Sequence, residues 1–542
     1  MCAQANNLLN VLWGKENLTS VINFDSLQIY QKSALGDDIK GELNFSPTPL
    51  GIGITPIFDE SGIHNSKNFY TFPLEKLTFS SSGGVVVTDQ AFFETTHEFF
   101  NIYFGSGYSR KIENSSASLV VMPFSLIHKN ANCTHNGIFI FAYNDNTTSN
   151  AVAQISSETC AYYKFDYVSV FGTTFSKQDI NFENNFYNYH AWNKTVADTA
   201  PILKLYSSYD IESPSFADNR DFIPANVSLY GLIDGDAHYS SECTTRAGMY
   251  PFCDQLLLPS YSLAKSIAGT LSVWLIEQQH EDFSKKKVSD VLEECNSNRW
   301  KDVTVENLSD MATGNYYQKT HDLDERSSKH LEFIYSATTN QAKLNLACTM
   351  FPKRKSPGKE FVYHTSDTYI LGAVLSEFIG TDGENYFEKV LAPFFKELGL
   401  SEAAQYSLTT DDAASQPYTG WGMFFVRDDI FKLSNFLHQK KMSDQSSFLQ
   451  DALNPDDTNS YSAIPSANIF YNNGFWSRKY EKGEFGCSSE TWIPFMSGFG
   501  GITVALLPNN MTYYYFSDGY TYSWDKAVRA ANRIKPFCKE KI

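Results

Sequence analysis

The chain has 542 residues and a formal charge of −18, which argues against several classes of function. A nucleic-acid-binding protein needs a basic surface to neutralise phosphates, and so does a protein that adheres to anionic membranes. Apolar residues make up 42% of the chain, enough for a large core, and aromatic residues make up 15%. At roughly 150 residues per domain, the length favours two to four domains.

The sequence leaves two cellular compartments open. Residues 1–20 lack the basic start, apolar stretch and cleavage site of a signal peptide, as expected for a cytoplasmic chain. Nine N-x-S/T sequons instead favour a secreted or lumenal glycoprotein, whereas the nine cysteines fit neither compartment neatly. Cys133 with Cys160 and Cys243 with Cys253 can close short loops, and the odd number leaves one thiol over. No apolar run approaches the roughly 18 residues that span a bilayer.

Residues 1–219 are predicted to form a β-rich domain. Short runs of β-branched and aromatic residues alternate with Asn, Ser, Gly and Asp, which is typical of strands joined by turns. These runs cover 84–87, 118–124, 137–142 and 161–171. The pattern favours a sandwich-like arrangement, with the Asn-rich segment 181–193 as a loop. Such a domain could recognise substrate, shape the site or mediate assembly, and Trp192 and Tyr187 could line a groove or pack in its core.

Residues 220–542 are predicted to alternate strands with helices. Helices are expected where apolar residues recur every three or four positions or follow a capping residue, at 262–279, 369–378, 430–438 and 524–534. Strands are expected at 227–233, 502–507 and 512–516. Since strands stand at both ends with helices between them, the expected fold class is α+β, an antiparallel sheet flanked by helices.

One motif in the second part carries chemistry. Ser262-Leu263-Ala264-Lys265 is an S-x-x-K motif at a predicted helix start, where residues three apart share a face. A serine becomes a nucleophile when a base takes its proton, and a lysine of lowered pKa can be that base. The spacing also fits an ordinary helix-end serine with a surface lysine. Chance matches of the same form begin at Ser284, Ser356 and Ser523.

Signatures of other common chemistries do not occur. The sequence has no G-x-S-x-G elbow, no phosphate-binding glycine loop, no H-E-x-x-H and no C-x-x-C pair. Two further blocks do accompany the S-x-x-K motif. Residues 357–368 read PGKEFVYHTSDT before a predicted helix, and residues 496–501 read MSGFGG at the predicted opening of a strand.

In this order and spacing, the three blocks resemble the serine β-lactamase and penicillin-binding-protein-like hydrolases. The branch of class C β-lactamases, esterases and 6-aminohexanoate-dimer hydrolases is the most similar. Weaker likenesses occur at 303–314 and 420–429. The resemblance covers residues 220–542 and implies an antiparallel sheet between helical layers plus an all-helical part. It also implies hydrolysis of a small-molecule ester or amide through an acyl-enzyme, with no metal and no cofactor.

The resemblance also assigns roles to residues. Ser262 would be the nucleophile, Lys265 its partner in proton removal, and Tyr363 the residue that relays a proton to the leaving group. A nearby cation such as Lys265 would have to stabilise the phenolate of Tyr363. Backbone N–H groups of Ser262 and Phe499 would form the oxyanion hole. The predicted substrate contacts are Thr365, Met496, Ser497 and Gly498.

The sequence departs from the family pattern at two of these positions. Thr365 stands where the family usually has Asn, and Met496 stands where it usually has Lys or His. Methionine carries no charge and donates no hydrogen bond, so a substrate carboxylate would lose its anchor. We therefore expect neutral or cationic substrates rather than β-lactams or peptidoglycan peptides. The alternatives are a catalytically lapsed binding or structural module, and a chance similarity within an unrelated fold.

Overall fold

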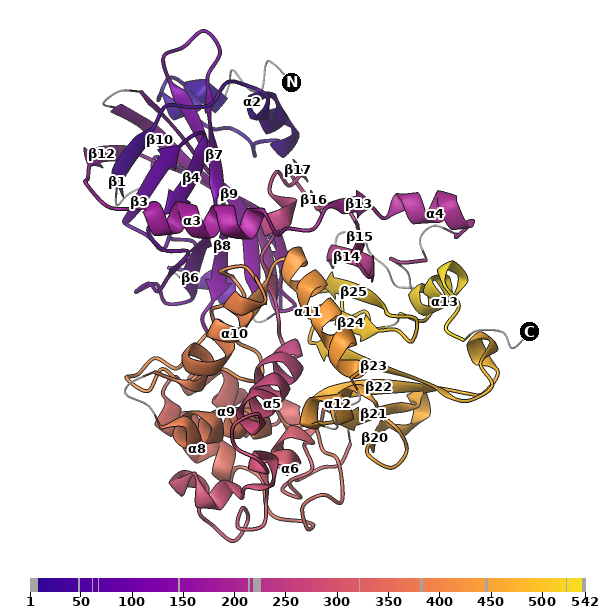
Figure 1. Ribbon diagram of the computed structural model, residues 1–542. Helices are drawn as coiled ribbons and strands as arrows, with labels where there is room; N and C mark the ends of the chain where they lie inside the picture. The colour runs from indigo at the N-terminus through magenta and orange to yellow at the C-terminus, as the bar shows by residue number, and fades with distance from the viewer. Residues whose placement is uncertain are drawn as a thin grey trace.

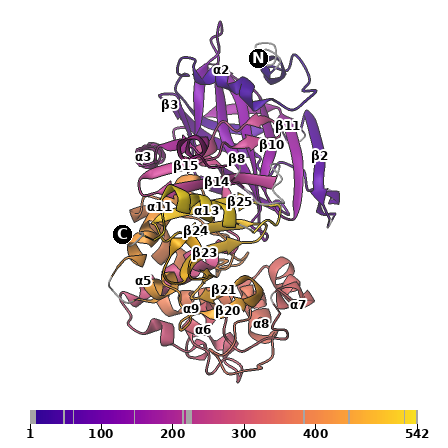
Figure 2. The ribbon, with the colours of Figure 1, turned by 90° about the vertical axis from the view of Figure 1, so that its right-hand side faces the viewer.

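The computed structural model describes residues 8–46, 49–60, 62–66, 68–144, 147–212, 215–217, 226–320, 322–380, 384–443, 447–522 and 524–538. Figures 1 and 2 show a large N-terminal sheet at one end of the molecule and a helical region at the other. A second sheet lies between them.

The N-terminal half forms one continuous twelve-stranded antiparallel sheet, not the two sheets of the predicted sandwich. All four predicted strand regions are confirmed, and the longest strands, β8 and β9, are buried along almost their whole length. Neighbouring side chains of β8 alternate between two cores: Val120 and Met122 belong to an aromatic core, while Leu119 and Val121 belong to a core that continues into the second half of the chain. Both faces are therefore covered without a second sheet. The strands are β1 (Ile39–Phe45), β2 (Gly51–Asp59), β3 (Lys76–Ser82), β4 (Val85–Thr88), β5 (Phe92–Phe93), β6 (Phe100–Phe104), β7 (Gly107–Lys111), β8 (Ser118–His128), β9 (Thr134–Asn144), β10 (Thr147–Thr159), β11 (Tyr163–Phe171) and β12 (Thr173–Lys177).

The prediction of a loop at 181–193 is wrong, because residues Glu183–Asn193 form helix α3. None of its side chains is buried, so the helix has no apolar face that periodicity could reveal. Contacts with distant segments hold it instead: Asn185 Nδ2 donates to the Thr88 carbonyl, and Asn188 Nδ2 donates to Glu402. Local composition could not predict partners so far away in the chain.

The second sheet has nine strands in the order β13-β15-β14-β25-β24-β23-β22-β21-β20. All neighbours are antiparallel except β13 and β15, and β13 precedes the predicted boundary at residue 220. The three strands predicted in this part are confirmed. The bounds are β13 (Thr199–Pro201), β14 (Val227–Asp234), β15 (Ala237–Ser240), β20 (Tyr461–Ile464), β21 (Ile469–Asn472), β22 (Phe475–Tyr480), β23 (Thr491–Gly498), β24 (Ile502–Leu506) and β25 (Met511–Ser517); two short pairs join β16 (Thr244–Thr245) to β17 (Gly248–Met249) and β18 (Leu258–Pro259) to β19 (Phe424–Phe425).

Helices cover both faces of the second sheet, which confirms the predicted fold class. Helices α5 and α11 share a core with the inner side chains of β14, β24 and β25, and α13 and α4 pack on the opposite face. The helices are α2 (Gln28–Gln31), α4 (Leu203–Tyr209), α5 (Leu271–Glu277), α6 (Val305–Ser309), α7 (Ser328–Leu331), α8 (Asn340–Thr349), α9 (Thr365–Ile379), α10 (Ala392–Glu397), α11 (Arg427–Lys441), α12 (Phe448–Leu453) and α13 (Asp525–Ile534).

Four disulfide bonds pair the cysteines that the structure describes. Cys133–Cys160 and Cys243–Cys253 confirm the two short-loop pairings that the sequence suggested. Cys295–Cys348 and Cys487–Cys538 span 53 and 51 residues, and only the fold brings them together. The ninth cysteine, Cys2, lies outside the described residues.

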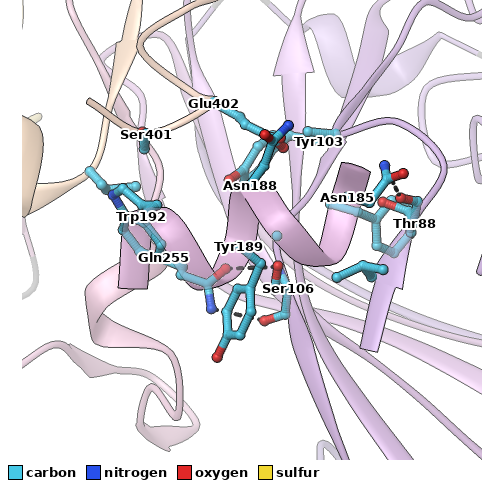
Figure 3. A pocket seen from close by; sticks show the side chains of 15 residues that line it. Thr88, Tyr103, Ser106, Asn185, Asn188, Tyr189, Trp192, Gln255, Ser401 and Glu402 are labelled. Carbon is cyan, nitrogen blue, oxygen red and sulfur yellow. Dashed lines mark hydrogen bonds between the residues drawn. The ribbon is translucent and has the colours of Figure 1, made fainter. Parts of the chain in front are cut away.

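Helix α3 covers a pocket between the two halves of the chain (Figure 3). Trp192 and Tyr189 line it, and the Gln255 amide both donates to and accepts from the backbone of Ser106. The cavity holds about 50 Å³, whereas ligand sites hold roughly 300–1,000 Å³. The pocket is thus part of the contact between the two halves and too small for a substrate.

Candidate active site

Ser262 lies at the start of a buried helix, as predicted. The helix runs on through η5 (Lys265–Thr270), which is wound as a π-helix, into α5. Short π-helical segments often occur at functional sites because they alter which side chains share a face. Ser262 and Tyr363 keep part of their surface exposed, while Lys265 is only 3% exposed.

The structure brings the three predicted catalytic residues into contact. Lys265 Nζ lies 3.3 Å from Ser262 Oγ, and the Tyr363 hydroxyl donates to the same oxygen over 2.8 Å. Tyr363 and Ser262 are 101 residues apart in sequence, so only the fold can join them. Both groups that could move a proton to or from the serine are therefore within hydrogen-bond reach of it.

The surroundings of Lys265 suit a base. Its Nζ also donates to Thr365 Oγ1 and to the Gly420 carbonyl, each over 3.1 Å. Burial lowers the pKa of Lys265 to about 8, although the carboxylates of Glu325 and Asp367 oppose the shift. When the amine is neutral, its two N–H groups can keep the Thr365 and Gly420 contacts. The lone pair then points to the Ser262 hydroxyl.

Tyr363 is held in its protonated form. Burial, together with nearby Tyr471 and Glu325, raises its pKa well above that of a free phenol. The cation expected to stabilise a phenolate is close by, because Lys265 Nζ lies over the tyrosine ring, 5.2 Å from its centroid. The ring is stacked on Trp476, which fixes its direction. Tyr363 is therefore a proton donor in the free protein.

Glu325 lies within the site, and no motif in the sequence marks it. Its carboxylate accepts from the Thr365 backbone N–H at 2.8 Å and from the Thr365 hydroxyl at 2.6 Å. The same hydroxyl accepts a hydrogen bond from Lys265. Thr365 is 6% exposed, and its hydroxyl bridges the Lys265 amine and the Glu325 carboxylate. Thr365 thus contacts Lys265 directly, and its predicted role in substrate binding stays a prediction. In the sequence, Glu325 lies in a charged stretch that resembles an ordinary solvated surface.

His364 anchors the segment that carries Tyr363 and Thr365. Its Nε2 lies 3.0 Å from Asp324, its Nδ1 lies 3.6 Å from Asp367, and its ring is stacked on Phe351. Burial alone would lower the pKa of His364, but the two carboxylates raise it to about 9. A charged, buried imidazolium therefore holds the backbone between the catalytic tyrosine and the first turn of α9.

The third block ends a strand and does not open one. Met496, Ser497 and Gly498 are the last residues of β23, and a turn at 499–501 leads into β24. Met496 is 3% exposed and packs in the core on the α5 side of the sheet, so it presents little surface to a substrate. The end of β23 lies beside the nucleophile turn, because a Cβ added at Gly498 would stand 3.0 Å from the Ser260 carbonyl oxygen.

Aromatic rings surround this strand end. Phe499 is 40% exposed, stacks on Tyr162 at 5.4 Å and meets Tyr520 edge-on at 5.2 Å. Tyr162 comes from the N-terminal half and also contacts Tyr335 and Tyr261. Since Tyr261 precedes Ser262, these rings form an apolar border next to the serine.

The residues that the structure describes contain neither a metal-binding cluster nor a membrane-spanning helix. No cluster of three His, Cys, Asp or Glu side chains there could hold a metal ion. Among the described helices, none combines the length and apolar character needed to cross a bilayer.

Comparison with known proteins finds similarity at the level of solved structures. No family model matches the chain, and no curated protein matches it. A penicillin binding protein from Bacillus halodurans is 16% identical with a TM-score of 0.43, covering 61% of this chain and 98% of that one. A D-stereospecific amidohydrolase from Streptomyces sp. is 17% identical with a TM-score of 0.43, covering 59% and 98%. A class C β-lactamase is 13% identical with a TM-score of 0.40, covering 65% and 96%. The solved structures similar to this chain are hydrolases of the serine β-lactamase and penicillin-binding-protein fold, the group that its three motif blocks resemble.

Proposed function

We propose that residues 220–542 form a serine hydrolase that cleaves a small-molecule ester or amide through an acyl-enzyme on Ser262. The observation that carries the proposal is the contact of Ser262 Oγ with both Lys265 and Tyr363. Buried structural lysines are seldom left next to a partly exposed serine and a tyrosine hydroxyl, because burying an ammonium costs free energy. Burial of Lys265 at this place is explained if its neutral amine accepts the proton of Ser262.

The geometry supports the following sequence of steps. Neutral Lys265 takes the Ser262 proton as Oγ attacks the acyl carbon, and backbone N–H groups of Ser262 and Phe499 bind the oxyanion. Tyr363 gives its proton to the leaving oxygen or nitrogen as that bond breaks, and the Lys265 ammonium reprotonates Tyr363. Water then attacks the acyl-enzyme with the same groups acting in reverse, which releases the acid and restores Ser262.

Covalent labelling tests the proposal. A fluorophosphonate probe is expected to modify the folded protein at Ser262, and peptide mapping identifies the modified residue. Ser262→Ala is the matched control and should take up no probe. If the folded wild-type protein stays unlabelled and turns over none of a broad set of acyl esters and amides, the site has lapsed and the proposal is wrong.

The substrate is proposed to be neutral or cationic. Met496 supplies no cation for a carboxylate, Glu325 places a negative charge behind the site, and the Phe499 border suits an apolar group. Of two esters that differ only in one carboxylate, the neutral ester is expected to show a kcat/KM about tenfold higher. Steady-state kinetics on the pair measures this ratio. Faster turnover of the carboxylate ester would contradict the assignment.

We also propose that the protein is secreted or lumenal, with a cytoplasmic location as the alternative. Four disulfide bonds support an oxidising compartment. Sequon asparagines with exposed side chains could carry glycans: Asn17, Asn114, Asn193 and Asn510. Asn132 is a sequon residue with a fully buried side chain, so its amide is closed to a glycan in the folded protein. A loss of mass on enzymatic deglycosylation of the natural protein tests this location.

A further inference from the structure

The N-terminal half reaches the catalytic serine through one loop. Residues 129–133 join β8 to β9, and Asn132 within this loop is fully buried. Asn132 has φ +56°, a left-handed conformation that asparagine tolerates better than other side chains do. Its neighbour Cys133 is bonded to Cys160, which fixes the loop to the end of β10.

The Asn132 amide is bonded at both ends to the strand and turn that carry Ser262. Its Oδ1 accepts from the Tyr261 backbone N–H at 2.6 Å and from the Ser260 hydroxyl at 3.2 Å. Its Nδ2 donates to the Met423 carbonyl at 3.1 Å. Met423 in turn pairs with Ser260, whose backbone N–H donates to the same carbonyl. One side chain from the first half thus joins two segments of the second.

The contact falls where the backbone is strained. Tyr261 has φ +40°, which a bulky side chain rarely adopts because its Cβ crowds the carbonyl oxygen. Such a conformation persists only where the surroundings impose it. The hydrogen bond to Asn132 holds the Tyr261 N–H, and the Tyr261 hydroxyl lies 3.3 Å from Cys133 Sγ. The turn that aims Ser262 is therefore fixed from the N-terminal half.

The same loop also contacts the side of the site that holds Lys265. Trp421 Nε1 donates to the Asn130 carbonyl at 2.9 Å, and the Tyr418 hydroxyl donates to Asn130 Oδ1 at 3.2 Å. Between these two residues lies Gly420, whose carbonyl accepts from Lys265. The loop therefore contacts the residue before Ser262 and two side chains that flank Gly420, the carbonyl partner of Lys265.

We propose that Asn132 is a positioning residue for Ser262, so that the N-terminal half completes the active site and is not a separate binding module. The inference rests on the proposed function, since it concerns the reactivity of the same serine. Without the amide, the Tyr261–Ser262 turn can relax, and Oγ moves away from the line between Lys265 and the acyl carbon. A displacement of about 1 Å can cost about 10²-fold in rate.

The variant Asn132→Gly separates the side chain from the backbone, because glycine adopts a positive φ without strain. We expect kcat per active site to fall about 10- to 100-fold, with KM changed by less than about threefold. The number of active sites is counted from the burst of product on mixing with a nitrophenyl ester. Asn114→Gly is the matched control, an exposed asparagine of the same half with φ +57°, and should keep the wild-type kcat.

A purely structural role gives a different result. In that case the substitution Asn132→Gly lowers the fraction of folded, titratable enzyme and leaves kcat per active site unchanged. That outcome overturns the inference. If Asn132→Gly does not fold, Ser260→Ala removes one of the contacts to Asn132 Oδ1 and should lower kcat per active site in the same direction. An unchanged kcat in Ser260→Ala then overturns the inference as well. Absence of labelling and turnover in the wild-type protein would instead refute the proposed function.

Discussion

Replacing Lys265 by methionine is expected to lower kcat by about 10²- to 10⁴-fold, the usual contribution of a positioned general base. Methionine fills much of the same volume and carries no charge, so the buried site loses its proton acceptor without gaining an unpaired ion. Tyr363 can still donate to Ser262 Oγ in this variant, but no group remains to take the serine proton. The fall should appear in kcat and in the rate of labelling by a fluorophosphonate.

The pH profile of the wild-type protein provides the second measurement on Lys265. Because burial lowers the pKa of Lys265 to about 8, the amine is mostly protonated at pH 7 and mostly neutral at pH 9. Only the neutral form can accept a proton, so kcat/KM should rise with pH and reach half its plateau near pH 8. This rise should be lost in Lys265→Met.

Lys343 provides the matched control for Lys265→Met. It is also fully buried, with its pKa lowered by burial to about 7, and its Nζ donates to the Phe333 carbonyl and lies over Trp421. No contact with Ser262 is among those the structure gives for Lys343. Lys343→Met should therefore retain the rise in kcat/KM near pH 8, even if its stability falls. If Lys343→Met loses the rise and Lys265→Met keeps it, the base has been misassigned.

The contact of Ser262 with Lys265 and Tyr363 could be predicted because the motifs that carry these residues are local. Ser262 and Lys265 are three residues apart on one helix, and Tyr363 lies in a block whose spacing from them is characteristic. Three strands of the second sheet, β14, β24 and β25, were equally readable, since runs of apolar residues mark them whatever their partners are. Even the two short disulfide loops followed from chain distance alone.

The groups that support these three residues could not be predicted, because their partners lie far away in the sequence. Glu325 acts through Thr365, 40 residues on, and Asn132 acts on Tyr261 from 129 residues before it. Neither stands in a pattern that differs from a surface loop. The same reason explains α3 and the single N-terminal sheet, one face of which shares a core with the second half of the chain. Short motifs identify the reactive side chains, whereas tertiary contacts with distant residues determine how these side chains are oriented.

Replacing Tyr363 by phenylalanine is expected to lower kcat on amides by about 10²- to 10³-fold, and by much less on nitrophenyl esters. The ring can keep its stacking on Trp476, so the change removes one hydroxyl and little packing. An amine leaves only after it gains a proton, and the high pKa of Tyr363 keeps that proton available at neutral pH. A nitrophenolate leaves without one, which makes the pair of substrates a direct probe of proton donation.

Kinetics on an amide and a nitrophenyl ester with the same acyl group give the decisive ratio. Tyr471→Phe is the matched control, because Tyr471 is also buried, packs on the same Trp476 at 5.0 Å and loses the same atom. It should change kcat by less than about threefold on either substrate. If Tyr363→Phe lowers both rates equally, the hydroxyl only orients Ser262 through its 2.8 Å hydrogen bond. The proton for the leaving group would then have to come from the Lys265 ammonium, the other proton-bearing group that contacts Ser262 Oγ.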